Sequence, residues 1–502
     1  MLATLRTAAV FGVEACPVLV EVDVSFGLPG FTMVGLPDAS VRESRDRVKS
    51  AIRNSGFDFP AHRITVNLAP ADVRKAGASF DLPIALGVLA AQGIVTRREV
   101  VDAVLLGELS LDGSIHPTRG VLPIAAAARR DGVTSILLPA ANAGEAAIVS
   151  GLTVVPVSSL AEAVKALNDP SSVSPAPRAA PPRICASAAD LADVRGQRLA
   201  RRALEIASAG GHNLLLVGPP GAGKTMMARR LPGILPPLTF EEALEATAVH
   251  SVAGLLPRGA GLLIERPFRA PHHTISDVAL VGGGSMPRPG EVSLAHNGVL
   301  FLDEMLEFNR HVLEVLRQPL EEGTVTVARA ARVASFPARF VLVGAMNPCP
   351  CGFSGDPLRE CRCTPQQVDR YRGRLSGPLR DRLDLTVDVP ALPVAELTEA
   401  PPPADSSSVV RSRVIAARER QRDRYAPDGI RTNAELRPPF VGKYCRSDAA
   451  GERILARAAH RLVLSARAYD RVRKVARTIA DLDAADQVTG DHLAEALQFR
   501  LT

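Results

Sequence analysis

Hydrophobic and polar positions along the first third of the chain follow two different periods. Short β-branched and aliphatic runs predict strands, and apolar residues three and four positions apart predict helices. The expected strands are residues 18–24, 64–68 and 135–138, and the expected helices are residues 39–54, 83–92 and 123–130. Strands mixed with helices in this way indicate an α/β domain.

Fully apolar runs in the middle of the chain have the length and composition of buried strands. They cover Leu214–Val217, Val299–Leu302 and Phe340–Met346. The segment Thr324–Phe336 instead reads as a strand pair with a short turn. Near the C-terminus the pattern is helical, with Arg and Lys at helical spacing. The expected helices there are Ser412–Tyr425, Ala449–Leu464, Ala468–Asp481 and His492–Phe499.

Two segments without periodicity divide the chain. Residues 171–183 are rich in Pro, Ser and Ala, and residues 400–408 form a shorter segment of the same kind. A chain of 502 residues is also too long for one hydrophobic core. We therefore expect an α/β domain at 1–170, a linker at 171–186, a core at 187–399, a linker at 400–410 and a helical segment at 411–502.

The overall composition is that of an ordinary globular protein, with 46% hydrophobic and 22% charged residues. The net charge of +6 mildly favours an anionic partner, but aromatic residues at 4% argue against base stacking. The apolar runs are too short to cross a bilayer, and Arg6 and Glu14 interrupt any signal-peptide core. We expect a cytoplasmic protein without a membrane partner, whose seven cysteines are thiols or metal ligands rather than disulfides.

The first candidate site is the glycine-rich segment after the strand Leu214–Val217. Residues 218–225 match the pattern GxxxxGK(S/T) of a phosphate-binding loop and lead into a helix-favouring stretch. Its glycines let backbone N–H groups point at phosphate oxygens, and the helix N-terminus adds positive charge. Lys224 is expected to reach the β- and γ-phosphates of ATP, and the Thr225 hydroxyl to bind Mg²⁺. The expected ATP-binding residues of the loop are Gly218, Pro219, Pro220, Gly221, Ala222, Gly223, Lys224, Thr225 and Met226.

Two acids follow the apolar run Val299–Leu302, as in the second nucleotide motif of phosphate-loop ATPases. Asp303 is expected to hold Mg²⁺ through water, and Glu304 to orient and deprotonate the attacking water. A strand followed by an acidic helix start has the same sequence. The phosphate loop upstream favours hydrolysis over that interpretation.

Four cysteines lie close together after the strand Phe340–Met346, as Cys349-x-Cys351 and Cys361-x-Cys363. Four thiols in a short polar loop can form a Zn²⁺ site. Reduced cysteines without metal fit the same sequence, because C-x-C pairs are less common than C-x-x-C in zinc sites.

Further stretches, taken with these motifs, resemble the magnesium-chelatase-like AAA+ ATPases of the YifB/ComM group over nearly the whole chain. The stretches that carry the resemblance are Asp193–Gln197, Arg269–Ser276, Pro289–Gly298, Asn347–Gly352 and Ser376–Asp384. The resemblance implies a ring-forming motor, a homohexamer with ATP held between subunits. It also implies that the central region is an AAA+ αβα domain with helicase-type hairpin inserts and that the C-terminal segment is a helical lid.

The resemblance also assigns roles to single residues. Asn347 corresponds to sensor 1, which helps to place the attacking water, and Arg467 corresponds to sensor 2 on the lid. Arg382 corresponds to the arginine finger, which reaches the γ-phosphate bound by the neighbouring subunit. The expected adenine contacts are Val194, Gly196 and Gln197.

Arg380 departs from the family pattern, which has an apolar residue at this position. The finger role can therefore shift from Arg382 to Arg380. In another interpretation, these arginines only pair with Asp381 and Asp384.

Two inserts resemble those of helicase-type AAA+ proteins. The strand pair Thr324–Phe336 would project Arg329 and Arg332 into the pore of the ring, where they can hold DNA phosphates without reading sequence. An ordinary surface hairpin, whose arginines keep an edge soluble, fits the same residues. The second insert, residues 272–288, can form another pore loop, although we expect its two leading histidines to be buried hydrogen-bonding residues.

The N-terminal domain resembles the proteolytic domain of Lon. Ser79 lies where Lon has its serine nucleophile, but Val121 occupies the position expected for the lysine base. No lysine occurs between Lys75 and Lys165, and a hydroxyl without a base is not activated. We expect an inactive protease fold that serves assembly or binding.

The resemblance as a whole implies a motor that hydrolyses ATP to translocate on DNA, with helicase or branch-migration activity in recombination or natural transformation. An alternative is the motor subunit of a metal chelatase, which remodels a protein partner and does not bind DNA. A third is a scaffold whose ring holds ATP as a structural ligand. The complete set of catalytic residues argues against the scaffold, and the Lon-like domain argues against the chelatase subunit.

Overall fold

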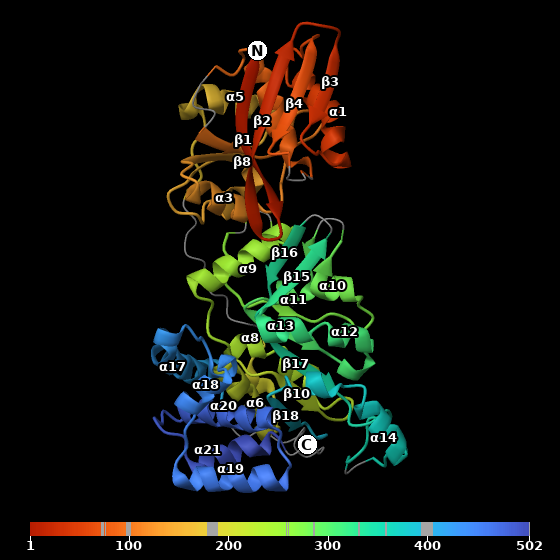
Figure 1. Cartoon of the computed structure of the whole chain (residues 1–502), viewed down its shortest axis with the longest axis vertical. Coiled ribbons are helices and arrows are strands. Elements are labelled where there is room, and N and C mark those ends of the chain that lie inside the picture. The colour runs from red at the N-terminus through yellow and green to blue at the C-terminus, as the bar shows by residue number, and fades with distance from the viewer. Residues whose placement is uncertain are drawn as a thin grey trace.

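The computed structural model describes residues 1–500 except 72–74, 76, 97–101, 178–188, 258, 260, 285–286, 330–331, 357–358 and 393–404. An N-terminal domain, a central core and a group of C-terminal helices follow one another along the long axis of the molecule (Figure 1). None of the helices in these described ranges is long and apolar enough to cross a bilayer.

The N-terminal domain is built on a seven-stranded mixed sheet in the order β3-β4-β2-β1-β5-β8-β9. Its strands are β1 (Leu2–Phe11), β2 (Glu14–Ser25), β3 (Gly30–Val34), β4 (Arg63–Ala69), β5 (Ala103–Leu105), β8 (Ser135–Pro139) and β9 (Thr153–Val157). Its longer helices are α1 (Ala39–Asn54), α2 (Asp81–Ala91), α3 (Val121–Arg130) and α5 (Leu160–Asn168). Each strand and helix expected in this region is present, which confirms the α/β prediction.

Alternation along β2 explains how this sheet holds its helices. Val18, Val20 and Val22 are buried, whereas the residues between them are more exposed. The valine face packs against α2, and a Cβ added at Gly87 of this helix would lie 2.6 Å from Val22. Glycine therefore allows the close approach of helix and sheet.

The central core contains a five-stranded parallel sheet in the order β11-β14-β17-β10-β18. Its strands are β10 (Leu214–Val217), β11 (Phe268–Arg269), β14 (Gly298–Leu302), β17 (Phe340–Met346) and β18 (Leu385–Asp388). The three apolar runs of the sequence form β10, β14 and β17, as predicted. Because the strands are parallel, the residues that follow these three strands meet at one edge, the carboxyl edge. The residues that precede the strands lie at the opposite, amino edge.

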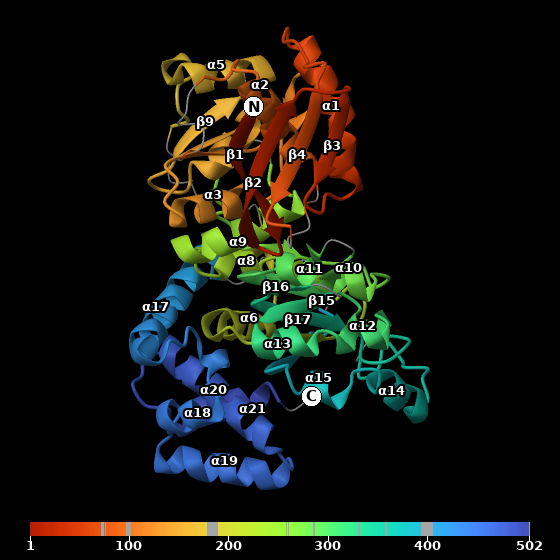
Figure 2. The ribbon, with the colours of Figure 1, turned by 45° about the horizontal axis from the view of Figure 1, so that its top comes forward.

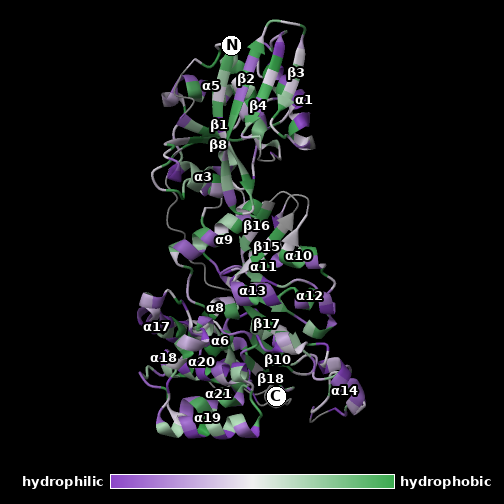
Figure 3. Ribbon diagram, in the orientation of Figure 1, coloured by the Kyte–Doolittle hydropathy of each residue, from purple (hydrophilic) through white to green (hydrophobic). Residues whose placement is uncertain are grey.

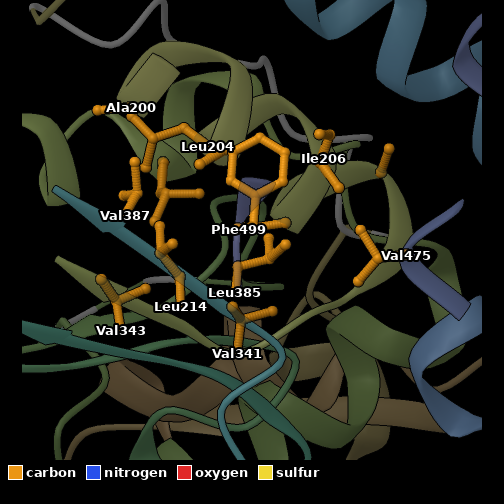
Figure 4. Close-up of a cluster of buried hydrophobic side chains, with 14 of the residues drawn as sticks. Ala200, Leu204, Ile206, Leu214, Val341, Val343, Leu385, Val387, Val475 and Phe499 are labelled. Atoms are coloured by element: carbon orange, nitrogen blue, oxygen red, sulfur yellow. The ribbon is translucent and has the colours of Figure 1, made fainter. Parts of the chain in front are cut away.

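Apolar residues on one face of this sheet pack against helices from distant parts of the chain. Leu214 and Leu385 share a fully buried cluster with Leu204 of α6 (Arg198–Gly210) and with Phe499 (Figure 4). The same cluster includes Val475 of α20 (Ala466–Leu482), so the C-terminal helices complete the core of the nucleotide-binding region.

The C-terminal segment is helical, as predicted. In addition to α20 it contains α17 (Ser407–Tyr425), α18 (Pro438–Tyr444), α19 (Ala449–Arg461) and α21 (Gly490–Gln498). Helix α17 begins inside the range predicted as a linker, because the side chain of Ser406 caps the N–H of Val409. The sequence pattern also misses α18, which has only seven residues.

Both inserts of the core form hairpins. β15 (Thr324–Arg329) and β16 (Arg332–Pro337) pair antiparallel, which confirms the predicted strand pair. The second insert forms α10 (Asp277–Val281) and the short strands β12 (Gly282–Gly283) and β13 (Arg288–Pro289), also antiparallel.

The N-terminal domain rests on helix α9 (Phe240–Ala253) of the core (Figure 2). The Gly120 N–H donates to the Ser251 carbonyl at 3.1 Å, and the Ser251 hydroxyl donates to the buried carboxylate of Glu145. The two regions are thus joined by hydrogen bonds as well as by the chain between them.

Candidate nucleotide site and cysteine cluster

The phosphate loop joins β10 to the short helix α7 (Lys224–Ala228) at the carboxyl edge of the core sheet. Gly221 and Gly223 have φ angles of +79° and +90°, a region that favours glycine. At Gly218 a Cβ would lie 2.1 Å from the carbonyl oxygen of Val389. The three glycines of the motif are therefore required for the fold of the loop.

Lys224 is held inside this loop. Its ammonium group donates to two carbonyl oxygens of the loop at 2.6 and 2.9 Å and to Asn347 Oδ1 at 3.2 Å. Burial lowers the pKa of Lys224, and the charges of Asp303 and Glu304 act in the opposite direction. The fold therefore brings together Lys224, the two acids and Asn347, which the sequence analysis placed in one site.

The two residues expected to hold Mg²⁺ also meet. The Thr225 hydroxyl donates to Asp303 Oδ2 at 2.6 Å. A hydroxyl and a carboxylate oxygen are hard ligands of the kind that Mg²⁺ binds beside the phosphates of a nucleotide. The donor set fits this cation.

Glu304 follows Asp303 with a side chain that is 58% exposed and thus open to an attacking water. Its φ of +49° is unusual for a residue other than glycine and turns the chain sharply after β14. His273 Nδ1 lies 3.9 Å from Glu304 Oε2. The prediction of buried histidines is wrong: His272 is exposed, and its ring contacts that of the partly exposed His273, with centroids 4.1 Å apart and planes tilted by 33°. Their loop reaches the rim of the nucleotide site, which local sequence does not reveal.

The expected adenine contacts border the phosphate loop. Gln197 Nε2 donates to the Pro390 carbonyl at 2.6 Å, and the neighbouring Val389 N–H donates to the Val217 carbonyl at 2.7 Å. Gly196 adopts a φ of +56°, and Val194 is buried in the cluster beneath. Their role in base binding stays a prediction.

Asn347 opens a loop that carries the four clustered cysteines. Their sulfur atoms all lie within 4.8 Å of one another. Three of the separations, 3.4, 3.6 and 3.7 Å, belong to the pairs Cys349–Cys351, Cys351–Cys361 and Cys349–Cys361. Tetrahedral Zn²⁺ with Zn–S bonds of about 2.3 Å would hold sulfurs about 3.8 Å apart. Backbone N–H groups of Phe353 and Arg362 lower the pKa of Cys351 to about 6, whereas desolvation and the neighbouring sulfurs raise the pKa of Cys361 and of Cys363.

The expected arginine finger lies at the other edge of the sheet. Arg382 precedes β18, whose first residue Leu385 pairs with Leu214, the first residue of β10. The phosphate loop begins only after Val217, the last residue of that strand. At about 3.3 Å per residue, the strand alone separates the two positions by roughly 10 Å.

The side chain of Arg382 is only 12% exposed and pairs with Glu321. Burial and the charges of Arg317, Arg467 and Arg471 lower its pKa. The alternative pairing with Asp381 and Asp384 is wrong. Asp381 instead pairs with Arg471 at 2.9 Å, and His212 lies 3.5 Å from Asp384. The sequence gives no signal for Glu321, because it lies far from Arg382 along the chain.

Arg380, Arg467 and Arg471 lie close to Arg382 but differ in exposure. Arg471 is buried and also donates to the Leu383 carbonyl at 3.0 Å. Arg380 and Arg467 are exposed, and within the described ranges neither side chain forms an ion pair. The structure thus places the sensor 2 candidate with the finger candidates rather than with the phosphate loop of its own chain.

The remaining predicted residues lie in the hairpin and the N-terminal domain. Arg329 and Arg332 are paired in register across the hairpin, but their side chains and the turn at 330–331 are outside the described residues. Ser79 is partly buried, and Val121 is fully buried in an apolar cluster at the start of α3. Lys75 is also buried, and its ammonium group donates to the Pro70 carbonyl.

Three family profiles match successive parts of the chain. Residues 20–142 match "Subunit ChlI of Mg-chelatase", residues 190–397 match "Magnesium chelatase, subunit ChlI", and residues 404–500 match "Magnesium chelatase, subunit ChlI C-terminal". The nucleotide site described above lies in the second of these ranges.

Three curated proteins are similar to the chain to different extents. Uncharacterized protein YifB of Salmonella typhimurium is 46% identical over 99% of this chain and 97% of its own length. Competence protein ComM of Haemophilus influenzae is 45% identical over the same shares of both chains, 99% and 97%. The magnesium-chelatase 38 kDa subunit of Rhodobacter capsulatus is 27% identical, over 41% of this chain and 61% of its own length.

Proposed function

The chain belongs to the YifB/ComM family of magnesium-chelatase-like AAA+ proteins, and we propose that it is a ring-forming ATPase that moves along DNA. The observation that carries this proposal is the division of the nucleotide site between two edges of one sheet. Lys224, Glu304 and Asn347 gather at the carboxyl edge, whereas Arg382 and Arg467 gather at the amino edge.

The division implies that two copies of the chain form one site. An arginine that stabilises the γ-phosphate has to touch it, and Arg382 is a strand length away from the phosphate loop of its own chain. A neighbouring copy, turned so that its amino edge faces this carboxyl edge, brings the arginines to the phosphates. Repetition of that contact closes a ring, for which we propose six subunits.

The residues of the site have defined parts in hydrolysis. Lys224 exchanges its carbonyl partners for the β- and γ-phosphates of ATP, and Asn347 orients the water. Glu304 takes a proton from that water as its oxygen bonds to the γ-phosphorus and the bond to the ADP oxygen breaks. Arg382 of the neighbouring copy stabilises the charge on the transferred group. Mg²⁺, held by Thr225 and Asp303, would neutralise charge on the phosphates.

We propose that the motor moves along DNA because two features favour binding of an anionic polymer. The core carries an antiparallel hairpin with Arg329 and Arg332 beside its turn, and the chain has a net charge of +6. A relative that is 45% identical over nearly the full length is named competence protein ComM. We therefore propose helicase or branch-migration activity in recombination or natural transformation, in the cytoplasm.

The flanking regions have proposed roles in the assembly. The N-terminal domain is proposed to be a Lon-like fold without proteolytic activity, because Val121 is buried where a lysine base would be required. The C-terminal helices are proposed to act as the lid, since α20 carries both Arg467 and the buried Arg471.

A protein-remodelling motor is the second candidate. The similarity to the magnesium-chelatase 38 kDa subunit favours it, although this similarity covers only 41% of the chain. In that case the ring would act on a protein partner, and the hairpin arginines would not need DNA.

The test is the ATPase rate with and without single-stranded or forked DNA, at two salt concentrations. We expect DNA to raise the rate and salt to weaken DNA binding. The double variant R329A/R332A should keep its basal rate and lose the stimulation, whereas R461A, at the exposed end of α19, should behave as the wild type. No stimulation together with no salt-sensitive binding would contradict the DNA proposal and favour the protein-remodelling motor.

A further inference from the structure

The cysteine cluster is in direct contact with the phosphate loop. Gly352, which follows Cys351, has a φ of +87°, and a Cβ added to it would lie 2.6 Å from Cδ of Pro220. Pro220 belongs to the loop, and its ring is fixed to the backbone, so the contact acts on the course of the loop itself.

The turn that makes this contact is held within the cluster. The Gly352 N–H donates to the Cys349 carbonyl at 3.0 Å, and the Ser354 N–H donates to the Cys349 sulfur at 3.2 Å. Cys349 itself is fully buried. The position of Gly352 against Pro220 therefore depends on the position of the sulfurs.

A second connection runs through the strand that precedes the cluster. The Gly218 N–H donates to the Met346 carbonyl at 3.1 Å, and Lys224 donates to Asn347 two positions before Cys349. The segment 346–352 thus follows the phosphate loop from its first glycine to its lysine. Residues 346–352 can lie along the phosphate loop because the cysteine loop begins directly after Asn347, a residue of the nucleotide site.

We propose that Cys349, Cys351, Cys361 and Cys363 bind one Zn²⁺ and that the metal-held turn braces the phosphate loop. Four thiolates in this arrangement are a structural zinc donor set. The hydrogen bonds from the Gly352 and Ser354 N–H groups hold the turn only at Cys349, whereas a metal would fix all four sulfurs at once. Binding of ATP therefore requires the metal, although no cysteine touches the nucleotide. This inference depends on the proposed ATP-binding function of the loop.

Two glycine substitutions test the contact without changing a ligand. Gly352 and Gly355 both have positive φ, at +87° and +79°, so alanine strains the backbone similarly at both positions. Only at Gly352 would the Cβ meet Pro220, because nothing lies within 4 Å of the Cβ at Gly355. We expect G352A to keep its metal and to bind ATP about tenfold more weakly than G355A.

The metal is tested on the full chain, purified without chelator, by elemental analysis and thiol titration. We expect about one zinc per chain in the wild type and in C16S, and neither zinc nor normal ATP affinity in C361S. ATP affinity is measured by binding of a fluorescent ATP analogue, not by hydrolysis. Wild-type protein without metal and with four titratable cluster thiols would overturn the zinc site.

Equal ATP affinity in G352A and G355A would overturn the brace while leaving the zinc site and the ATPase in place. Wild-type protein that binds no ATP would overturn the proposed ATPase and the brace together, and its metal content would still decide the zinc site. Failure of the DNA proposal affects none of these measurements.

Discussion

Arg471 of helix α20 donates to Asp381 at 2.9 Å and so ties the C-terminal helices to the segment that carries Arg382. The buried guanidinium also binds the Leu383 carbonyl at 3.0 Å, which fixes the backbone on both sides of Arg382. A movement of α20 must therefore move the segment that carries Arg382. The proposed lid and the proposed arginine finger are thus mechanically connected.

Loss of this tie should reduce turnover more than nucleotide binding. In R471A we expect a free energy of unfolding lower by about 1–3 kcal/mol, because buried hydrogen-bonding groups lose their partner. The ATPase rate of the assembled protein should fall about tenfold, with the affinity for ATP unchanged, since the phosphate loop is at the other edge of the sheet.

The rate and the affinity are measured well below the melting temperature, so that lower stability does not mimic lower turnover. R461A, an exposed arginine at the end of α19, is the matched control. A variant R471A with wild-type turnover would show that Arg471 does not position the finger.

Substitution of Glu304 should separate binding from hydrolysis. The side chain is exposed beside Asp303, so E304Q keeps the size and the fold of the site but removes the base. We expect near-normal ATP binding and a rate lower by about 10²–10⁴, the usual contribution of a general base. Single-turnover hydrolysis measures this step, and near-normal turnover would exclude Glu304 as the base.

The contact between α9 and the amino edge of the sheet should make the folding stability depend on pH. Hydrogen bonds from His296, at 3.0 Å, and from Asn297 lower the pKa of Glu245 to about 2. A carboxylate with a depressed pKa stabilises the fold above its unfolded pKa of about 4.3, and this contribution is lost as the pH falls towards 2.

E245Q should therefore melt at a lower temperature than the wild type at pH 7. The difference between the two proteins should shrink as the pH falls from about 4.5 towards 2. E241Q, in the first turn of α9, is the control. A difference in melting temperature that does not change with pH would contradict this role of the Glu245 charge.

Most of the fold and the phosphate loop could be predicted because their signals are local. Apolar runs gave β10, β14 and β17, and the eight residues 218–225 specify the loop by their own spacing. Lys224 and Asn347 could be placed in one site because parallel strands end at the same edge.

The features that sequence reasoning missed depend on contacts between distant segments. Arg382 meets Glu321, His273 meets Glu304, and Gly352 meets Pro220 only after the chain has folded. The error at His272 has the same origin. Without metal-ligand spacing the histidine pair is expected to be buried, but tertiary packing places this loop at the rim of the nucleotide site.

The central claim, a site shared by two copies, is tested most directly by mixing two inactive variants. K224A lacks the phosphate-binding lysine but has its arginines, and R382A lacks the finger but has its phosphate loop. In mixed rings, the phosphate loop of R382A meets the intact finger of K224A, so the mixture should hydrolyse ATP faster than either variant alone. A mixture that forms rings and shows no recovery at any ratio would contradict the shared site.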